Sequence, residues 1–362
     1  MTSAWKWLGV ALLLVAAASV TASAGTQTAA PRLTQQAPVA ARPAPPPPQY
    51  IRDQVNALGR AFNGRVGIAV RSIDEGWQCG WKADDLYPQQ SVSKLWVSIT
   101  ALDAVDKGRV RLNDRVTLSS DDITLFHQPI AALIRGKGAY TTTLDELMFK
   151  AITTSDNTAN DKLMRSVGGP DAVRNMIAAK HLGAIRFYNG ERALQSKIAG
   201  LIWSPSYSIG NAFYDARNAL PRAVREAAFN RYIEDPYDGA APGAIVGALA
   251  RLKRGELLSP ESTRKLLWIM GNTKTGAHRL KGGLQPGWTL SHKTGTGQEL
   301  GAVQAGYNDI GILTAPDGRS YSVAVMIKKT SVPLPTRMTL MNNVVRAVIA
   351  QHDMQTGTYA QQ

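Results

Sequence analysis

The chain has 362 residues, of which 44% are hydrophobic and 19% are charged, a composition ordinary for a globular protein with a substantial core. Lysine and arginine exceed aspartate and glutamate by 41 to 27, for a net charge of +14. Because basic runs and nucleic-acid-binding motifs are absent, we exclude nucleic acid as a partner and interpret the charge as a dispersed basic surface that attracts anions. The single cysteine, Cys79, excludes an internal disulfide and is predicted to be a small buried residue. Since no His, Cys, Asp or Glu group has metal-ligand spacing, we expect neither a metal nor another cofactor.

The first 50 residues are predicted to lie outside the globular fold. A basic residue, the apolar run 8–18 and the small-residue cleavage site 22–24 are typical of a secretory signal peptide over residues 1–24. Residues 25–50 are rich in Ala, Pro, Gln and Thr, which predicts a disordered tether. We therefore expect a periplasmic or secreted protein without a stable membrane span after signal cleavage, and an uncleaved N-terminal anchor is the alternative.

The periodicity of apolar residues then predicts helices and strands in a definite order. Helical spacing begins at 51–62, and two strands follow with a turn between them. Residues 91 to about 271 are mostly helical, with a capping box at 142–146. Three strands and a closing helix end the chain. The predicted strands are 66–70, 77–81, 288–293, 309–315 and 321–328, and the closing helix is 337–350.

Two strands at one end of the chain and three at the other favour one sheet that both termini share. We predict an α/β (α+β) fold, with a five-stranded antiparallel sheet flanked by helices and an inserted all-helical lobe. The globular domain is predicted to span residues 51–355, and 356–362 form a flexible tail. The sheet lobe would comprise about 51–85 and 285–352, and the helical lobe about 91–280.

A serine and a lysine stand at the start of the helix predicted over residues 91–106. Ser91 lies where unpaired backbone N–H groups favour negative charge, and Lys94 follows one turn later on the same face. A desolvated lysine can take the proton of a serine hydroxyl and so make the serine a nucleophile. The alternative is an N-cap serine beside a solvated lysine, since the same spacing also occurs at Ser3/Lys6 and Ser262/Lys265.

Two further short motifs follow Ser91-x-x-Lys94 in the chain. They are Ser155-Asp156-Asn157 and Lys293-Thr294-Gly295. Taken singly, the first is also a capped helix start and the second an edge-strand lysine. A second copy of the third motif occurs at Lys274-Thr275-Gly276, but we prefer the Lys293 copy because it ends the strand pattern 288–292. In this order, the three motifs are typical of class A β-lactamases and penicillin-binding proteins.

Around these motifs the chain resembles the class A serine β-lactamases, members of the penicillin-recognising serine hydrolase superfamily. The resemblance covers roughly residues 51–352. It rests on segments 87–94, 152–160, 255–258, 287–288, 292–297 and 308–311, the last two resembling a less common branch of the class. It implies a β-lactamase/transpeptidase-like fold with the active site in a cleft between a sheet lobe and a helical lobe.

The resemblance also implies a role for each motif. Ser91 would attack the amide carbonyl while Lys94 accepts or relays its proton, and the backbone N–H groups of Ser91 and Thr296 would form the oxyanion hole. Ser155 and Lys293 would pass a proton to the departing ring nitrogen. Asn157 would orient the side-chain amide of the substrate. The strand residues Lys293, Thr294, Gly295 and Thr296 would form the substrate-binding edge that holds the carboxylate of a small-molecule β-lactam.

Hydrolysis requires a further group, because class A enzymes use a glutamate to activate water. Glu191 begins the sequence Glu-Arg-Ala-Leu-Gln, which resembles the family motif Glu-x-x-Leu-Asn, with Gln195 in place of the asparagine. An amide is retained, and it could hold a water molecule. A competing alignment uses Trp203-Ser204-Pro205, which has no glutamate. The alternative for Glu191 is an exposed loop carboxylate.

The segment 196–236, called the extended segment below, is longer than a compact class A enzyme needs and is rich in aromatic residues. We interpret it as a packed excursion with a small core of its own, and a wall that reshapes the cleft is the alternative. Phe126 is expected at the cleft rim, or else in the core. The predicted function is that of an exported, monomeric serine β-lactamase; the alternatives are a D,D-peptidase or transpeptidase, and a domain that acylates without turnover.

Overall fold

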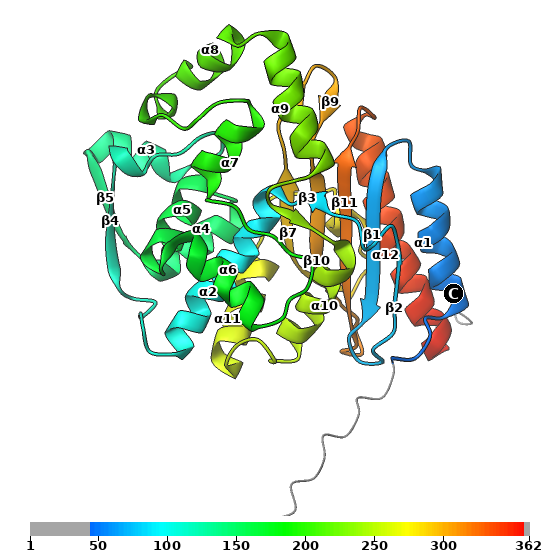
Figure 1. The fold of residues 1–362 in the computed structure, drawn as a ribbon. Helices are drawn as coiled ribbons and strands as arrows, with labels where there is room; N and C mark the ends of the chain where they lie inside the picture. The colour runs from blue at the N-terminus through cyan, green and yellow to red at the C-terminus, as the bar shows by residue number, and fades with distance from the viewer. Residues whose placement is uncertain (1–43, 358–362) are drawn as a thin grey trace, which may run out of the picture. The chain divides into compact units, whose positions relative to one another are not determined.

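The computed structural model describes residues 44–357 (Figure 1). The predicted signal peptide, most of the predicted tether and the end of the tail lie outside the described residues. In the part that the structure describes, no helix is both long and apolar enough to cross a membrane.

A five-stranded antiparallel sheet forms one half of the fold, in the order β2-β1-β11-β10-β7. Its strands are β1 (Arg65–Ser72), β2 (Gln78–Trp81), β7 (Thr289–Thr296), β10 (Tyr307–Thr314) and β11 (Ser320–Lys329). The central strands β10 and β11 are buried almost throughout, because both of their faces are covered by helices. The predicted sheet is therefore confirmed, including the pairing of N-terminal with C-terminal strands: Val70 pairs with Val323.

Helices cover both faces of this sheet. α1 (Gln49–Ala61) and α12 (Leu334–Thr356), blue and red in Figure 1, pack together with the outer face in one apolar core. α10 (Pro242–Lys253) packs against β1, β10 and β11 on the other face. The boundary expected for the helical lobe, 91–280, is thus wrong for α10. Its apolar residues lie all round the helix, so it fills the space between the sheet and the rest of the molecule.

The helical lobe is built around α2 (Lys94–Asp106), which follows the 3₁₀ turn Gln90–Ser93 and is buried on nearly all sides. The neighbouring helices are α3 (Ile130–Lys137), α4 (Leu144–Thr153), α5 (Asn157–Ser166), α6 (Gly169–Ala179) and α11 (Pro260–Gly271). Short 3₁₀ turns occur at Ser120–Asp122 and Leu280–Gly283. The lobe is not purely helical. A threonine-rich ribbon of β4 (Arg115–Ser119) and β5 (Ala139–Thr143) lies within it, where only helices were expected.

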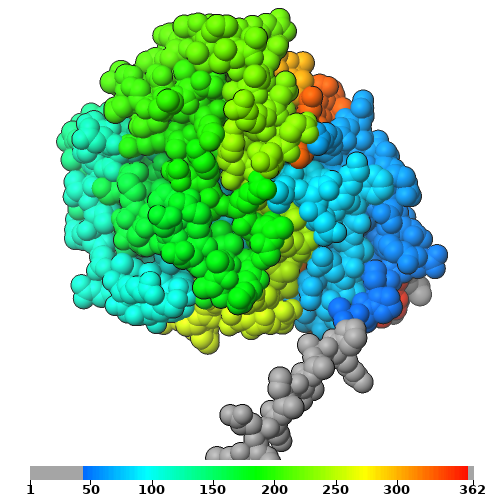
Figure 2. Space-filling model, viewed as in Figure 1, coloured from blue at the N-terminus to red at the C-terminus, as the bar shows by residue number. Residues whose placement is uncertain are grey.

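The chain between about 190 and 240 forms a further layer. It contains α7 (Glu191–Ile198), the 3₁₀ turn Pro205–Ser208, α8 (Ala212–Ala219) and α9 (Arg222–Glu234). It ends at β6 (Gly239–Ala240), which pairs with β3 (Tyr87–Pro88), and a small hairpin is formed by β8 (Glu299–Leu300) and β9 (Val303–Gln304). Two small apolar clusters hold this layer, as predicted for a packed excursion. Figure 2 shows the green chain, about 150–240, as a continuous surface over this face.

Candidate active site

Ser91 lies in the 3₁₀ turn that leads into α2, directly after a residue with unusual backbone geometry. Gln90 has φ +54°, a left-handed conformation that a non-glycine residue adopts only when its surroundings impose it. The backbone N–H of Gln90 donates a hydrogen bond to Oδ2 of Asp238 (2.7 Å), which helps to fix this conformation. The turn thereby brings the Ser91 hydroxyl to the wall of a cleft of about 590 Å³.

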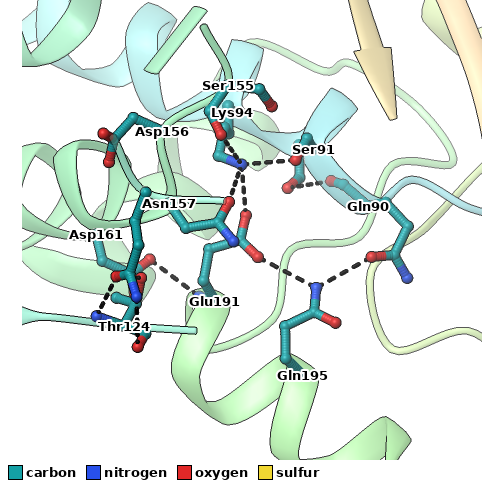
Figure 3. A network of polar contacts seen from close by, with 12 residues as sticks. Gln90, Ser91, Lys94, Thr124, Ser155, Asp156, Asn157, Asp161, Glu191 and Gln195 are labelled. Carbon is teal, nitrogen blue, oxygen red and sulfur yellow. Dashed lines mark hydrogen bonds and ion pairs between the residues drawn. The ribbon is translucent and has the colours of Figure 1, made fainter. Parts of the chain in front are cut away.

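Lys94 is at the centre of the polar contacts around Ser91 (Figure 3). Its side chain is completely buried, and its Nζ donates to Ser91 Oγ (2.6 Å) and Asn157 Oδ1 (2.6 Å). The same Nζ lies 2.8 Å from Oε1 of Glu191 and 3.3 Å from the backbone oxygen of Ser155. A buried lysine in this position can exchange a proton with either the serine hydroxyl or the carboxylate.

Glu191 is the first residue of α7, and its carboxylate points into the cleft. The backbone N–H of Glu191 donates to Oδ1 of Asp161 (2.9 Å), while Nε2 of Gln195 donates to Oε2 of Glu191 (3.2 Å). Gly190 has φ +86°, and a Cβ there would meet Met164 at 2.8 Å, so this entry into α7 requires glycine. Glu191 is only 3% exposed, so the interpretation as an exposed loop carboxylate is wrong.

Asp161 lies behind Glu191 and is itself buried. Burial is the main cause that raises the pKa of Asp161 to about 6, and the nearby charge of Glu191 adds to the effect. The competing alignment through Ser204 places that residue outside the cleft. Ser204 is on the surface, where its hydroxyl pairs with that of Ser206 (2.9 Å), and it does not line the cleft.

Ser155 and Lys293 meet on the side of the cleft nearest β7. Nζ of Lys293 donates to Ser155 Oγ (3.0 Å) and to the backbone oxygen of Thr294 (2.9 Å). Ser155 also has a left-handed backbone, with φ +60°. Burial, followed by the charge of Lys94, lowers the pKa of Lys293 well below its usual value. Lys274, from the second copy of the motif, is exposed instead.

Asn157 begins α5, and its side chain contacts both Lys94 and the loop at Leu125. Its Oδ1 accepts from Lys94, and its Nδ2 donates to the backbone oxygen of Leu125 (2.8 Å). Asp156 caps the helix, accepting from the backbone N–H groups of Ala159 (2.9 Å) and Ile130 (2.7 Å). The predicted capped helix start is therefore real, and it coexists with the placement of Asn157 in the cleft.

The end of β7 forms the opposite edge of the cleft. Gly295 lies so close to the turn before Ser91 that a Cβ would be 2.3 Å from the backbone oxygen of Gln89. This close approach sets Thr294 and Thr296 at the cleft, where both line the wall. Glycine is therefore required in the third motif for packing and not for flexibility.

Arg279 is a cleft residue that the sequence analysis missed. Its guanidinium donates to the backbone oxygen of Gly295 (3.0 Å) and to Thr296 Oγ1 (2.6 Å). The same group lies over the ring of Tyr307, with its Cζ 3.8 Å from the ring centroid. It adds a fixed positive charge to the edge formed by Thr294 and Thr296. No motif marks Arg279, because it lies in an irregular stretch between α11 and β7.

Phe126 lines the other side of the cleft, where it has φ +60° and is 36% exposed, so the alternative placement in the core is wrong. Its ring packs against two aromatic rings of α8, with centroid distances of 5.2 Å to Phe213 and 6.2 Å to Tyr214. Tyr214 and Arg217 line the same cleft, so the extended segment contributes to its wall as well as having its own core. Within residues 44–357 we find no group of three His, Cys, Asp or Glu side chains that could hold a metal ion.

The cleft thus brings together the predicted site residues. Those on its lining are Ser91, Phe126, Ser155, Asn157, Glu191, Thr294 and Thr296, and Lys94, Lys293 and Gly295 lie directly behind them. The arrangement supplies a hydroxyl group in contact with a buried lysine, a carboxylate in contact with the same lysine, and a cationic edge. Such a site can carry out nucleophilic attack on a carbonyl group, followed by attack of water.

Comparisons with known proteins agree with this arrangement. Residues 50–352 match the model of the Beta-lactamase enzyme family. The chain is 25% identical over 272 residues to β-lactamase VEB-1 of Pseudomonas aeruginosa, covering 75% of this chain and 80% of that protein.

Two solved structures have the same fold. A β-lactamase from Chitinophaga pinensis superposes with a TM-score of 0.68 at 25% identity, covering 83% of this chain and 99% of the other. An ancestral class A β-lactamase superposes with a TM-score of 0.65 at 27% identity, again covering 83% and 99%. With the family model matching most of its length, the chain belongs to the β-lactamase enzyme family, and its resemblance to class A is confirmed.

Proposed function

We propose that this protein hydrolyses the amide bond of β-lactam rings through an acyl-enzyme on Ser91, released by water that Glu191 activates. The observation that carries the proposal is the position of the Glu191 carboxylate. It is buried in the cleft of Ser91, 2.8 Å from Lys94, with Gln195 donating to its other oxygen. A penicillin-binding protein needs no such carboxylate to form its acyl-enzyme.

Acylation begins with attack of Ser91 Oγ on the ring carbonyl carbon. Lys94, 2.6 Å away, takes the hydroxyl proton when it is in its neutral form, which it reaches by giving a proton to Glu191. The backbone N–H groups of Ser91 and Thr296 stabilise the resulting oxyanion. When the carbon–nitrogen bond breaks, the ring nitrogen receives a proton from Ser155, which Lys293 resupplies across 3.0 Å.

Deacylation reverses these roles with water as the nucleophile. Before water attacks, the proton that Lys94 took from Ser91 replaces the one that Lys293 supplied, and Glu191 returns its proton to Lys94, so Glu191 is again a carboxylate. Glu191 then accepts a proton from the water as the water oxygen bonds to the acyl carbon. When the bond from that carbon to Ser91 Oγ breaks, the proton on Glu191 passes through Lys94 to the Ser91 oxygen. Gln195 holds Glu191 from one side and Lys94 holds it from the other. The longer glutamine side chain therefore does in this site what the family asparagine is expected to do.

Substrate binding depends on the two sides of the cleft. Lys293, Thr294 and Thr296 bind the carboxylate of the β-lactam, and Arg279 adds its charge at the same edge. Asn157 and Phe126 contact the side chain on the opposite side. We further propose that the protein is exported by its first 24 residues and acts as a monomer outside the cytoplasm, which the small-residue cleavage site supports.

The test is a time course of intact mass after mixing with benzylpenicillin. Wild type should be free of adduct at every time beyond the first turnovers. Glu191→Gln should acylate and then keep the adduct, because a general base contributes about 10²–10⁴-fold. Ser91→Ala should never be labelled. Glu226→Gln, an exposed glutamate of α9 paired with Arg222, is the matched control and should behave as wild type.

Two results would contradict the proposal. Normal turnover by Glu191→Gln would mean that another group activates the water. A stable adduct on wild type would favour the peptidase or the acylating domain, and cleavage of a D-Ala-D-Ala peptide would then distinguish between those two.

A further inference from the structure

The extended segment places an arginine in the cleft on the side of Asn157. Arg217 of α8 lines the cavity that contains Ser91, and its guanidinium lies over the ring of Tyr214 at 5.4 Å. Tyr214 in turn packs against Phe126, whose neighbour Leu125 accepts a hydrogen bond from Asn157. Arg217 thus contacts the aromatic part of the cavity lining, whereas Arg279, the other positive charge on the lining, contacts Thr296 of β7.

Arg217 is not neutralised by the protein. Its Nε is buried without a hydrogen-bond partner, and in the described residues its side chain forms no ion pair. Two other arginines of the segment lie outside the cleft lining. Arg222 pairs with Glu226 (2.7 Å), and Arg225 donates to the side-chain oxygen of Asn218 (3.5 Å), although its Nε, like that of Arg217, is buried without a partner. A guanidinium that borders a cleft without a carboxylate partner attracts an anion, and its terminal nitrogens can donate to one.

A second cavity of about 530 Å³ borders the cleft at Phe126 and Tyr214. Phe126, His127 and Tyr214 line both cavities, and Arg135 lines the second, where its guanidinium donates to the backbone oxygen of Ser208 (3.2 Å). No acidic side chain lines this second cavity in the described part of the chain. The outer end of the cleft is thus both aromatic and basic.

Two acidic side chains of residues 44–357 line the main cavity, and neither pairs with Arg217. Glu191 forms an ion pair with Lys94 (2.8 Å), and Glu299 is exposed and forms no ion pair with any residue that the structure describes. Asp215, on α8 itself, is exposed and lies two residues from Arg217, so the helical twist turns it to a different face. Arg217 therefore remains available to a ligand.

We propose that Phe126, Tyr214 and Arg217 form an outer subsite that binds an anionic group on the substrate side chain. The inference rests on the proposed function, in which Asn157 orients the side-chain amide. A side chain that continues past Asn157 reaches the rings of Phe126 and Tyr214, and a carboxylate at its end meets the guanidinium of Arg217. The preferred substrates are then β-lactams with two carboxylates, one bound at each side of the cleft.

The experiment compares two penicillins that differ by one carboxylate, benzylpenicillin and para-carboxybenzylpenicillin, whose additional carboxylate is at the far end of the side chain. The quantity measured is the ratio of kcat/KM for the carboxylated compound to that for the other. Arg217→Gln should lower this ratio about tenfold, the loss of one charge-assisted contact. Arg217→Lys should retain most of the ratio, because the charge is kept.

Arg225→Gln is the matched control, since it removes the same charge from the same segment outside the cleft, and it should leave the ratio at the wild-type value. An unchanged ratio in Arg217→Gln would overturn the subsite. Equal losses in Arg217→Gln and Arg225→Gln would also overturn it, because they would show a diffuse effect of net charge. A loss in Arg217→Lys as large as in Arg217→Gln would overturn the assignment to charge.

Failure of the proposed function gives a different signature. If wild type acylates but does not release product, the proposed deacylation is contradicted. The subsite is then tested by the ratio of the acylation rates of the two penicillins, which Arg217→Gln should again lower about tenfold. If neither penicillin acylates wild type, the proposed function is contradicted, and the subsite is overturned with it.

Discussion

The motif residues and the extended segment border the same cleft, but they are held in different ways. Lys94, Asn157, Glu191 and Lys293 are buried polar side chains, each with hydrogen-bond or ion-pair partners. The extended segment presents apolar side chains to solvent. Of the nine large hydrophobic side chains that are exposed within residues 44–357, four lie in it: Ile202, Ile209, Tyr214 and Val224.

This difference predicts where substitutions are tolerated. Removing one partner from the buried polar site leaves another group buried and unsatisfied, which costs about 1–3 kcal/mol and more for a charge. Substitutions on the exposed surface of α8 leave no such group and usually change stability by less than about 0.5 kcal/mol. The buried site is therefore expected to tolerate few substitutions, whereas the exposed surface of α8 is expected to tolerate many.

The largest effect is expected at the buried site. Lys293→Ala should lower kcat/KM for a β-lactam by about 10–100-fold, through a higher KM and slower acylation, because a charge-assisted contact and the partner of Ser155 are lost. Steady-state kinetics on benzylpenicillin measures it. Lys274→Ala is the matched control and should leave kcat/KM unchanged, since that lysine is exposed. An unchanged kcat/KM in Lys293→Ala would mean that the buried motif does not bind substrate.

A smaller effect is expected where the extended segment meets the buried site. Tyr232 of α9 is fully buried, and its hydroxyl donates to Asp238 (2.9 Å) and accepts from Nε2 of Gln90 (2.6 Å). Oε1 of Gln90 accepts in turn from Gln195 (3.0 Å), which donates to Glu191. One helix of the segment thus helps to position the carboxylate proposed to activate water.

Tyr232→Phe should therefore slow deacylation about tenfold, while acylation changes less, and should lower the free energy of unfolding by about 1–3 kcal/mol. Single-turnover kinetics separates the two steps. The control is Tyr237→Phe. The ring centroid of Tyr237 lies 5.9 Å from that of Tyr232, and its hydroxyl has no hydrogen-bond partner in residues 44–357. Loss of stability with unchanged deacylation would show that the segment supports the fold but does not position Glu191.

The parts of the molecule that the sequence predicted correctly depend on local spacing. Ser91 and Lys94 are one helical turn apart, so their contact follows from helix geometry. The five strands were predicted because their alternating or continuous apolar patterns are strong, and their residues are buried as those patterns require. The preference for the Lys293 copy rested on its strand context, and that copy is the buried one.

The parts that were missed depend on contacts between distant residues. Arg279 reaches the cleft through hydrogen bonds to β7 and a stack on Tyr307, none of which leaves a signal in its own neighbourhood. α10 has the spacing of an ordinary helix, and only the tertiary structure shows that it packs on the sheet. Arg217 is one arginine among many until α8 places it beside Tyr214.

A pH-dependent effect on stability is expected at Asp238, which lies just after the extended segment. Its carboxyl is fully buried and accepts from Tyr232 and from the N–H of Gln90, and burial raises its pKa to about 7 from the ordinary 3.8. A carboxyl whose pKa is raised on folding binds more protons in the native state between these values. Its contribution to stability is therefore complete below about pH 4 and is lost as the pH rises through about 7.

Asp238→Asn removes this titration. The free energy of unfolding of wild type, relative to the variant, should fall by up to about 1.4 kcal/mol for each pH unit between about pH 4 and 7, measured by urea denaturation. Asp161 and His352 titrate in both proteins, so their contributions cancel in the comparison. Asp235→Asn, a change to an exposed residue paired with Arg186, is the control and should leave the pH dependence unchanged over this range. Parallel curves for wild type and Asp238→Asn would show that Asp238 remains ionised in the folded protein over this pH range.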